Sequence, residues 1–152
     1  MSFRTHAISA ETLTGVRTSG RDVSGHPIEP VVATGGEPLR CCLRDAEAGE
    51  DLILFGYAPA LPASPYSEIG PVFAHARQCP TPPAEGYPAG WRGRRQVLRA
   101  YDKRGWIHPA THVHDGTDPE AEIAAIFADP EVEQIHSRNV AYGCYMFAIT
   151  RA

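Results

Sequence analysis

The sequence lacks a long apolar run. Its first residues contain no apolar segment of the kind found in signal peptides, and the longest apolar stretch, residues 52–61, is interrupted by Gly56 and Pro59. We therefore expect neither export nor membrane insertion, and a cytoplasmic location. Walker, GxGxxG, GxSxG, HExxH and EF-hand patterns are also absent, which excludes the enzyme classes that these motifs identify.

Cysteine is scarce, and its spacing fits no familiar framework. The four cysteines include the neighbours Cys41 and Cys42, which a β-strand would point to opposite faces, and the other two, Cys79 and Cys144, are distant in sequence. We expect reduced thiols rather than disulfides. No CxxC pair occurs, so a thiolate zinc site is not expected and no metal ligand is assigned. The sequence identifies no cofactor.

Excess charge of either sign is small. Fourteen Lys and Arg against eighteen Asp and Glu give a formal net charge of −4 over 152 residues. Such a chain has no overall attraction for nucleic acid or anionic lipid, although basic residues cluster locally between positions 92 and 104. The length matches one domain, residues 1–152.

Short segments with β-strand patterns dominate what is present. They predict an α+β fold, with six to seven short strands in a mainly antiparallel sheet or half-open barrel and one helix packed on it. The helix should begin at a Thr117/Glu120 capping box and bury Ile123, Ile126 and Phe127. A brief second helical segment is predicted at residues 10–16. Three hairpins are predicted, joining residues 39–44 to 51–57, 96–101 to 106–107, and 132–136 to 144–150.

The last hairpin contains a candidate catalytic pair. If it is symmetric about Val140, His136 faces Cys144 with the two Cβ atoms about 5 Å apart. An imidazole at that distance can lower a thiol pKa, which favours Cys144 as nucleophile and His136 as its base. The alternative is a buried structural cysteine beside a hydrogen-bonded histidine.

Several polar residues are candidates for binding a ligand. Arg99 and Tyr101 share one face of their strand, opposite the face predicted to join the core. Arg138 on the last turn suits a carboxylate or phosphate. The alternatives are structural, because Asn139 also suits a tight turn and surface arginines commonly face water. Two further candidates flank a long loop and complete the set: Tyr66 and His75.

His112 and His114 are spaced as two metal ligands on a strand could be. A cupin-like site needs more ligands on neighbouring strands, whereas this chain turns directly into a helix. Solvent-exposed loop histidines are the alternative.

Blocks of the sequence resemble a known family. The blocks lie at residues 39–47 with 49–50, 64–66, 70–73, 99–102, 127–130, 135–136, 139 and 143–145. Their order and spacing are similar to those of the bacterial family named domain of unknown function 1203, over Leu39 to Arg151. The resemblance implies one domain and carries over no activity. Arg138 stands where some members have a second histidine, and Ala141 where they have an arginine.

Together these features predict a cleft near the last hairpin that binds a small anionic molecule, either as an enzyme or as a binding protein. A non-catalytic interaction or homodimerising module is the rival hypothesis, through exposed strand edges or proline-rich loops. A metal-dependent enzyme is the third.

Overall fold

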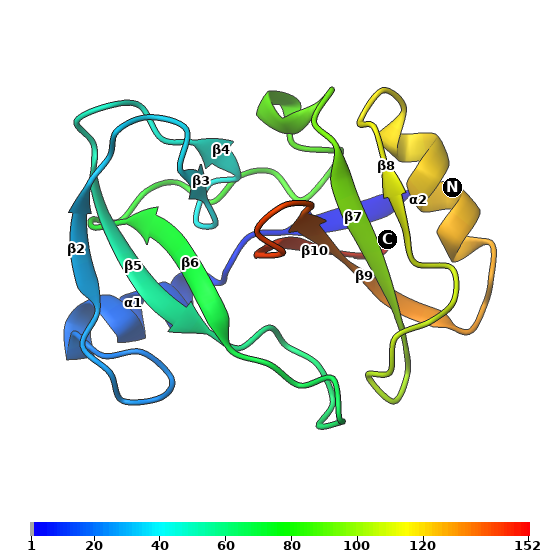
Figure 1. Ribbon diagram of the computed structural model, residues 1–152, viewed down its shortest axis with the longest axis horizontal. Coiled ribbons are helices and arrows are strands. Elements are labelled where there is room, and N and C mark those ends of the chain that lie inside the picture. The colour runs from blue at the N-terminus through cyan, green and yellow to red at the C-terminus, as the bar shows by residue number, and fades with distance from the viewer. Residues whose placement is uncertain (1) are drawn as a thin grey trace.

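The computed structural model describes residues 2–152, so Met1 of the predicted domain lies outside the described residues. The chain forms two five-stranded sheets that lie side by side (Figure 1), in the orders β1-β10-β9-β7-β8 and β2-β5-β6-β3-β4. Every pairing is antiparallel except that of β3 with β6. The strands are β1 (Phe3–His6), β2 (Glu29–Val32), β3 (Pro38–Leu39), β4 (Arg44–Asp45), β5 (Asp51–Tyr57), β6 (Gly70–His75), β7 (Gln96–Asp102), β8 (His112–His114), β9 (Val132–Asn139) and β10 (Tyr145–Arg151).

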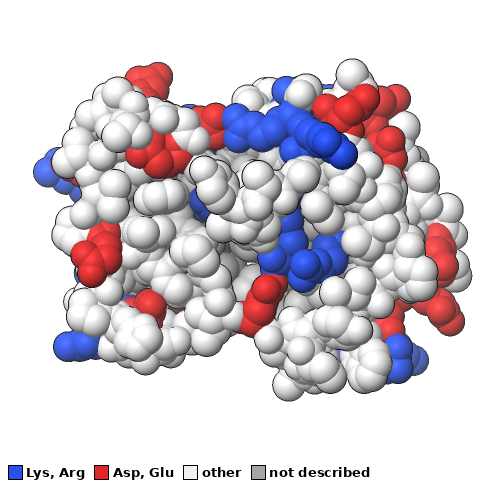
Figure 2. All heavy atoms as spheres, in the orientation of Figure 1, with Lys and Arg blue, Asp and Glu red and all other residues white. Residues whose placement is uncertain are grey.

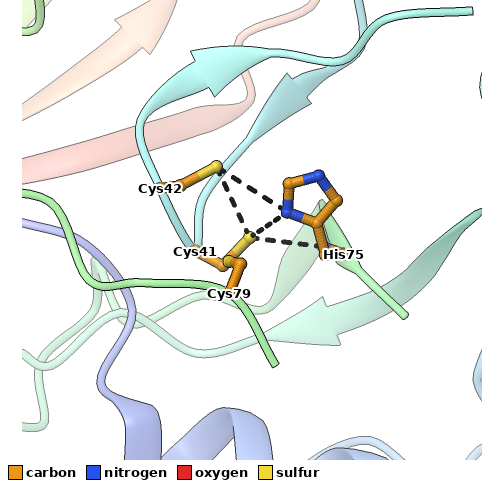
Figure 3. A group of neighbouring side chains, drawn as sticks. All are labelled: Cys41, Cys42, His75 and Cys79. Carbon is orange, nitrogen blue, oxygen red and sulfur yellow. Dashed lines mark hydrogen bonds between the residues drawn. The ribbon is translucent and has the colours of Figure 1, made fainter. Parts of the chain in front are cut away.

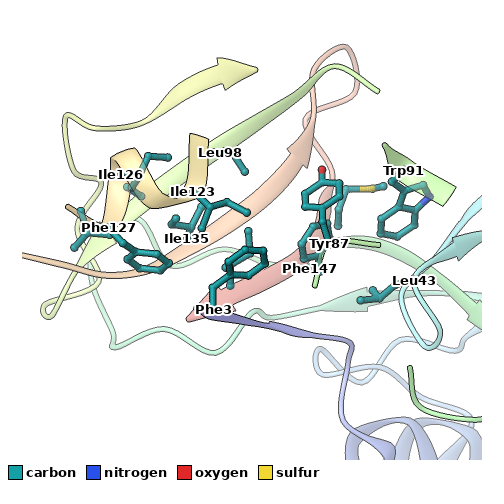
Figure 4. Packing of buried hydrophobic residues seen from close by; sticks show 14 residues of the cluster. Phe3, Leu43, Tyr87, Trp91, Leu98, Ile123, Ile126, Phe127, Ile135 and Phe147 are labelled. Atoms are coloured by element: carbon teal, nitrogen blue, oxygen red, sulfur yellow. The ribbon is translucent and has the colours of Figure 1, made fainter. Parts of the chain in front are cut away.

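The first sheet is covered on one face by helix α2 (Pro119–Phe127). Asp118 caps the helix by accepting a hydrogen bond from the Ala121 amide, and proline occupies the first turn, where no amide hydrogen is needed. The apolar side of α2 packs on strand residues such as Leu98 and Ile135 (Figure 4). Trp91 of the short helix η1 (Ala89–Trp91) belongs to the same cluster and stacks on Phe147. Burial of each large apolar side chain here stabilises the fold by about 1.5 to 3 kcal/mol.

The second sheet has its own core, against which helix α1 (Ala10–Ser19) places Leu13. The continuous apolar run of β5 lies at the centre of this sheet, between β2 and β6. The two cores interlock, because Tyr145 of β10 is buried among residues of the second sheet while Leu43 is buried among those of the first. Among residues 2–152, no helix has the length and apolar character that a bilayer crossing requires.

The α+β class is consistent with this structure, but its predicted detail is wrong. The chain forms two separate sheets instead of one sheet or a half-open barrel, and it has more strands and a further α-helix. The segment predicted as a brief helix at residues 10–16 extends to Ser19, where Gly20 caps it. The predicted capping box is also replaced, since Asp118 rather than Thr117 caps α2.

The predicted hairpin of residues 39–44 with 51–57 is wrong. Leu39 and Arg44 pair with each other, and the chain between them makes a turn closed by a hydrogen bond from the Leu43 amide to the Leu39 carbonyl oxygen. Leu43 adopts a φ of 56°, which an extended strand excludes. Cys41 and Cys42 therefore lie on a turn and not on opposite faces of a strand. Of the second predicted hairpin, the structure contains one isolated antiparallel β-bridge, between Tyr101 and Ile107.

A loop from the second sheet reaches across to the first. This bridging loop, residues 58–69, joins β5 to β6, and its Ser64 hydroxyl donates to the Gly105 carbonyl oxygen in the turn after β7. Tyr66 packs edge-on against Trp106 in the same turn. Gly105 has a φ of 78°, and a Cβ atom there would lie 2.7 Å from the Pro62 carbonyl oxygen. The glycine thus permits the close approach of the two backbones.

Replacing Gly105 with alanine is expected to lower the free energy of unfolding by about 2 kcal/mol, because alanine is strained at this φ and its methyl group meets a backbone oxygen. Gly25→Ala is the matched control, since Gly25 has the same φ of 78° but no atom within 4 Å of an added Cβ. Urea denaturation should show a clearly smaller loss for the control. Equal losses would contradict a close approach at Gly105.

Candidate functional site

A cleft lies between the two sheets near the last hairpin. A pocket of about 440 Å³ adjoins a smaller one of about 150 Å³, since Pro71, Tyr142 and Cys144 line both. One wall comes from β5, β6 and the segment before β3, and the other from the turn between β9 and β10. The volume suits a small molecule. In Figure 2 this face of the protein is hollowed, and Lys and Arg atoms gather there beside an acidic side chain.

Four predicted residues share the face of the first sheet that is turned away from α2. Arg99 of β7 pairs directly with His136 of β9, Tyr101 follows Arg99 by two positions, and Arg138 follows His136 by two. Tyr145 pairs with Arg138 and points to the same side. Leu98 and Ala100 belong to the apolar cluster that packs on α2, so Arg99 and Tyr101 lie on the opposite face, as predicted. Tyr101 is nevertheless fully buried, and neither residue lines a cleft pocket.

Two of these arginines meet a carboxylate from the other sheet. Arg138 is almost completely buried and forms an ion pair with Glu68 of the bridging loop. The same Glu68 oxygen lies 3.9 Å from an Nη1 nitrogen of Arg99. Arg138 also donates to the Gly143 carbonyl oxygen at 2.7 Å, which fixes the guanidinium beside the turn. The carboxylate of Glu68 thus occupies an anion position at the cleft.

Arg40, which the sequence analysis did not select, supplies a third guanidinium. It is 2% exposed and donates to the carbonyl oxygens of Tyr145 at 2.8 Å and Pro38 at 2.5 Å, so it joins the two sheets. Burial lowers its pKa to about 10, which leaves it charged at neutral pH. Among residues 2–152 no carboxylate oxygen lies within ion-pair distance of it, although it lines the larger pocket. Glu37 also lines this pocket, and Asp45 acts on the charge of Arg40 from a longer distance, so the Arg40 guanidinium stands in the cleft wall without a direct ion pair.

Three buried polar atoms on the same face lack a hydrogen-bond partner among residues 2–152: the Tyr101 hydroxyl, His136 Nδ1 and Arg138 Nε. The ring of His136 lies between those of Tyr101 and Tyr145, with centroid distances of 4.7 and 5.1 Å. Burial, with the positive charge of Arg99, lowers the pKa of His136 to about 3, so the imidazole is neutral at physiological pH. Buried polar groups are ordinarily paired, so these atoms are unusual; of the three residues, Arg138 lines a cleft pocket, while Tyr101 and His136 lie beneath the pocket lining.

The predicted facing of His136 and Cys144 is wrong. His136 pairs with Ala148, whereas the Cys144 carbonyl accepts a hydrogen bond from the Asn139 amide. The hairpin turn is centred beyond Val140, and a register irregularity between Tyr145 and Phe147 shifts the remaining pairs. Within residues 2–152 the Cys144 thiol makes one hydrogen bond, to the Tyr142 carbonyl oxygen at 3.9 Å. The geometry that suggested a nucleophile and its base is therefore absent.

The remaining candidates are divided between the cleft and other places. Asn139 lines the larger pocket, as Cys144 does. Tyr66 instead packs on Trp106, and His75 lies in a cluster of thiols beside a separate pocket. The sequence analysis did not select Glu68, which lines the smaller pocket and pairs with both Arg138 and Arg99.

His112 and His114, the two histidines considered as metal ligands, lie in different environments. His112 lies 2.6 Å from a Glu122 carboxylate oxygen of α2, and both residues are half-buried. The backbone carbonyl of Ala110 and this carboxylate raise the pKa of His112, although partial burial opposes them. His114 is buried, its ring edge-on to Tyr87, and its Nδ1 accepts from the Gly116 amide. Their arrangement does not resemble that of two metal ligands.

Comparison with known proteins identifies a family but no characterised relative. Neither the curated proteins nor the solved structures contain a match. The family model described as Protein of unknown function (DUF1203) matches residues 36–151 and thus confirms the resemblance seen in the sequence. The protein belongs to the DUF1203 family.

Proposed function

We propose that the cleft binds a small carboxylate-bearing molecule, with Arg138 and Arg99 as its anion partners. The observation that carries the proposal is the convergence of these two guanidiniums, from adjacent strands of one sheet, on a single carboxylate from the other sheet. Guanidinium groups match carboxylates in shape and charge. A ligand carboxylate can take the position that Glu68 occupies.

Three features support a ligand over a purely structural ion pair. Glu68 stands on a loop and is about one-third exposed, so water can replace the protein around it when it leaves. Arg40 adds a buried positive charge along the cleft wall. Asn139, which lines the larger pocket, offers a polar contact for the rest of the molecule. We place this binding protein in the cytoplasm, where its four free cysteines would stay reduced.

Isothermal titration with a panel of small mono- and dicarboxylic acids tests this function, and the corresponding amides serve as neutral probes. At least one acid should bind, its amide should not, and Arg138→Gln should abolish binding. Glu68→Gln should tighten binding by about tenfold, because the ligand no longer competes with an internal charge-assisted hydrogen bond of about 1.5 kcal/mol.

Arg104→Gln is the matched control, since Arg104 pairs with Asp102 on an exposed turn and does not line the cleft. It should bind the acid as the wild type does. Binding of acid and amide with equal affinity, or unchanged binding by Arg138→Gln, would contradict an anion site at this place.

A further inference from the structure

Three thiols and one imidazole come together from separate segments of the chain, and none of them lines the cleft pockets. We call this group the thiol–imidazole cluster. The ligand-type atoms of its four members all lie within 4.8 Å of one another. Figure 3 shows side chains from the β3–β4 turn, the end of β6 and the loop after β6 turned toward a common point. Its members are Cys41, Cys42, His75 and Cys79.

The distances inside the cluster match those around a tetrahedral zinc ion. The Cys41 and Cys42 sulfurs are 3.9 Å apart, and they lie 3.4 and 3.8 Å from His75 Nδ1. Bonds of about 2.3 Å to sulfur and 2.0 to 2.1 Å to nitrogen in tetrahedral geometry separate two sulfurs by about 3.8 Å and a sulfur from the nitrogen by about 3.6 Å. The protein thus holds these side chains near the required spacing.

We propose that the thiol–imidazole cluster is a Cys3His site for a divalent transition metal, with zinc as the preferred ion. Three thiolates and one imidazole form a ligand set typical of closed structural zinc sites. Such an ion would tie the turn between β3 and β4 to the segment that leaves β6.

The surroundings of the cluster resemble those that orient the ligands of a metal site. With Nδ1 of His75 directed at the sulfurs, its Nε2 lies 3.2 Å from a Glu50 carboxylate oxygen. A carboxylate in this position fixes the tautomer and orientation of a metal-binding histidine. Glu50 is itself held by Arg44 at 2.7 Å. The imidazole is thus oriented by contacts that do not involve the sulfurs.

Hydrogen bonds from the backbone and nearby positive charges also favour metal binding by the cluster. The His75 amide donates to the Cys41 sulfur at 3.3 Å, a hydrogen bond that stabilises a thiolate, and Arg17 of α1 holds the His75 carbonyl oxygen at 2.9 Å. Three thiolates and a divalent ion carry a net charge of −1, and the charges of Arg44 and Arg17 act on the thiols of Cys42 and Cys79, respectively. A pocket of about 310 Å³ beside Cys79 and His75 gives a route of entry.

Cobalt(II) titration of the reduced, chelator-treated full chain tests the site. We expect one ion per chain, intense visible bands of tetrahedral cobalt with sulfur-to-cobalt charge transfer, and their loss when zinc is added. Cys79→Ser should lose the stoichiometric uptake, and Glu50→Gln should keep one ion with an affinity about 10 to 100-fold weaker.

Cys144→Ser is the matched thiol control, because Cys144 lies at the cleft between the sheets, and it should still bind one ion. Far-ultraviolet circular dichroism of each metal-free variant separates loss of a ligand from loss of the fold. The proposal is overturned if the reduced wild type takes up no cobalt, or if folded Cys79→Ser binds it as the wild type does. Should Cys79→Ser fail to fold, an unchanged affinity in Glu50→Gln would equally count against it.

Discussion

Replacing Arg40 with alanine is expected to lower the free energy of unfolding by about 3 to 5 kcal/mol, measured by urea denaturation. The side chain is 2% exposed and donates to two carbonyl oxygens, those of Pro38 and Tyr145. Truncation removes both donors and leaves a cavity where the sheets meet. Since each buried acceptor without a partner costs about 1 to 3 kcal/mol, these terms account for the loss.

Two other variants separate the causes of this loss. Arg40→Met keeps most of the volume without the donors, so its loss should be smaller than that of alanine by the cavity contribution. Arg95→Ala removes an exposed arginine and should change the free energy of unfolding by less than about 0.5 kcal/mol. A small effect of Arg40→Ala would mean that the two sheets are held together without this side chain.

Stability should also fall as the pH is lowered from about 6.5 toward 3, in part because of His136. Its pKa is about 3 in the folded protein and about 6.5 when unfolded, so between these values the unfolded chain binds a proton that the folded chain does not. The full contribution is therefore present above pH 6.5 and is lost progressively below it. By pH 4 the free energy of unfolding has fallen by on the order of 3 kcal/mol through this group.

The comparison with His136→Gln isolates this contribution. Carboxylates with lowered pKa values also destabilise the fold in acid, but they act equally in both proteins. The groups that face His136 are Arg99 and Tyr101 from β7, Tyr145 from β10, and the Gln134 side-chain oxygen, which lies 3.0 Å from His136 Nε2; the variant retains all of them. Urea denaturation from pH 7 to pH 4 should give a shallower slope for His136→Gln. The exposed-site control His26→Gln should follow the wild type, and parallel curves for all three would refute a neutral buried His136.

Locally encoded elements of this fold could be predicted from the sequence. Helix α2 has its own cap and apolar stripe, and β5 is a continuous apolar run, so neither depends on distant contacts for recognition. The segment Leu39 to Arg44 looks equally strand-like. Its turn is fixed by contacts with the rest of the sheet and by the positive φ of Leu43, and neither is visible in composition.

The candidate site, too, could be predicted from the sequence only where local patterns determine it. The shared face of Arg99 and Tyr101 follows from alternation along one strand, so it was predictable. The register of the last hairpin was not, because the turn is displaced and the ladder shifts next to Met146. Glu68 and the thiol–imidazole cluster have no sequence signal at all. Their positions depend on loops and turns that only the assembled sheets bring together.

The two sheets also differ in how their strands are distributed along the chain. All five strands of the second sheet lie between residues 29 and 75, whereas the first pairs β1, at residues 3–6, with β10, at residues 145–151. During synthesis from the amino terminus, the second sheet has every strand available when barely half of the chain exists. Strand β1 must wait for its partner until the last strand has emerged from the ribosome. The inter-sheet cleft, one wall of which is the turn leading into β10, can therefore form only at the end of synthesis.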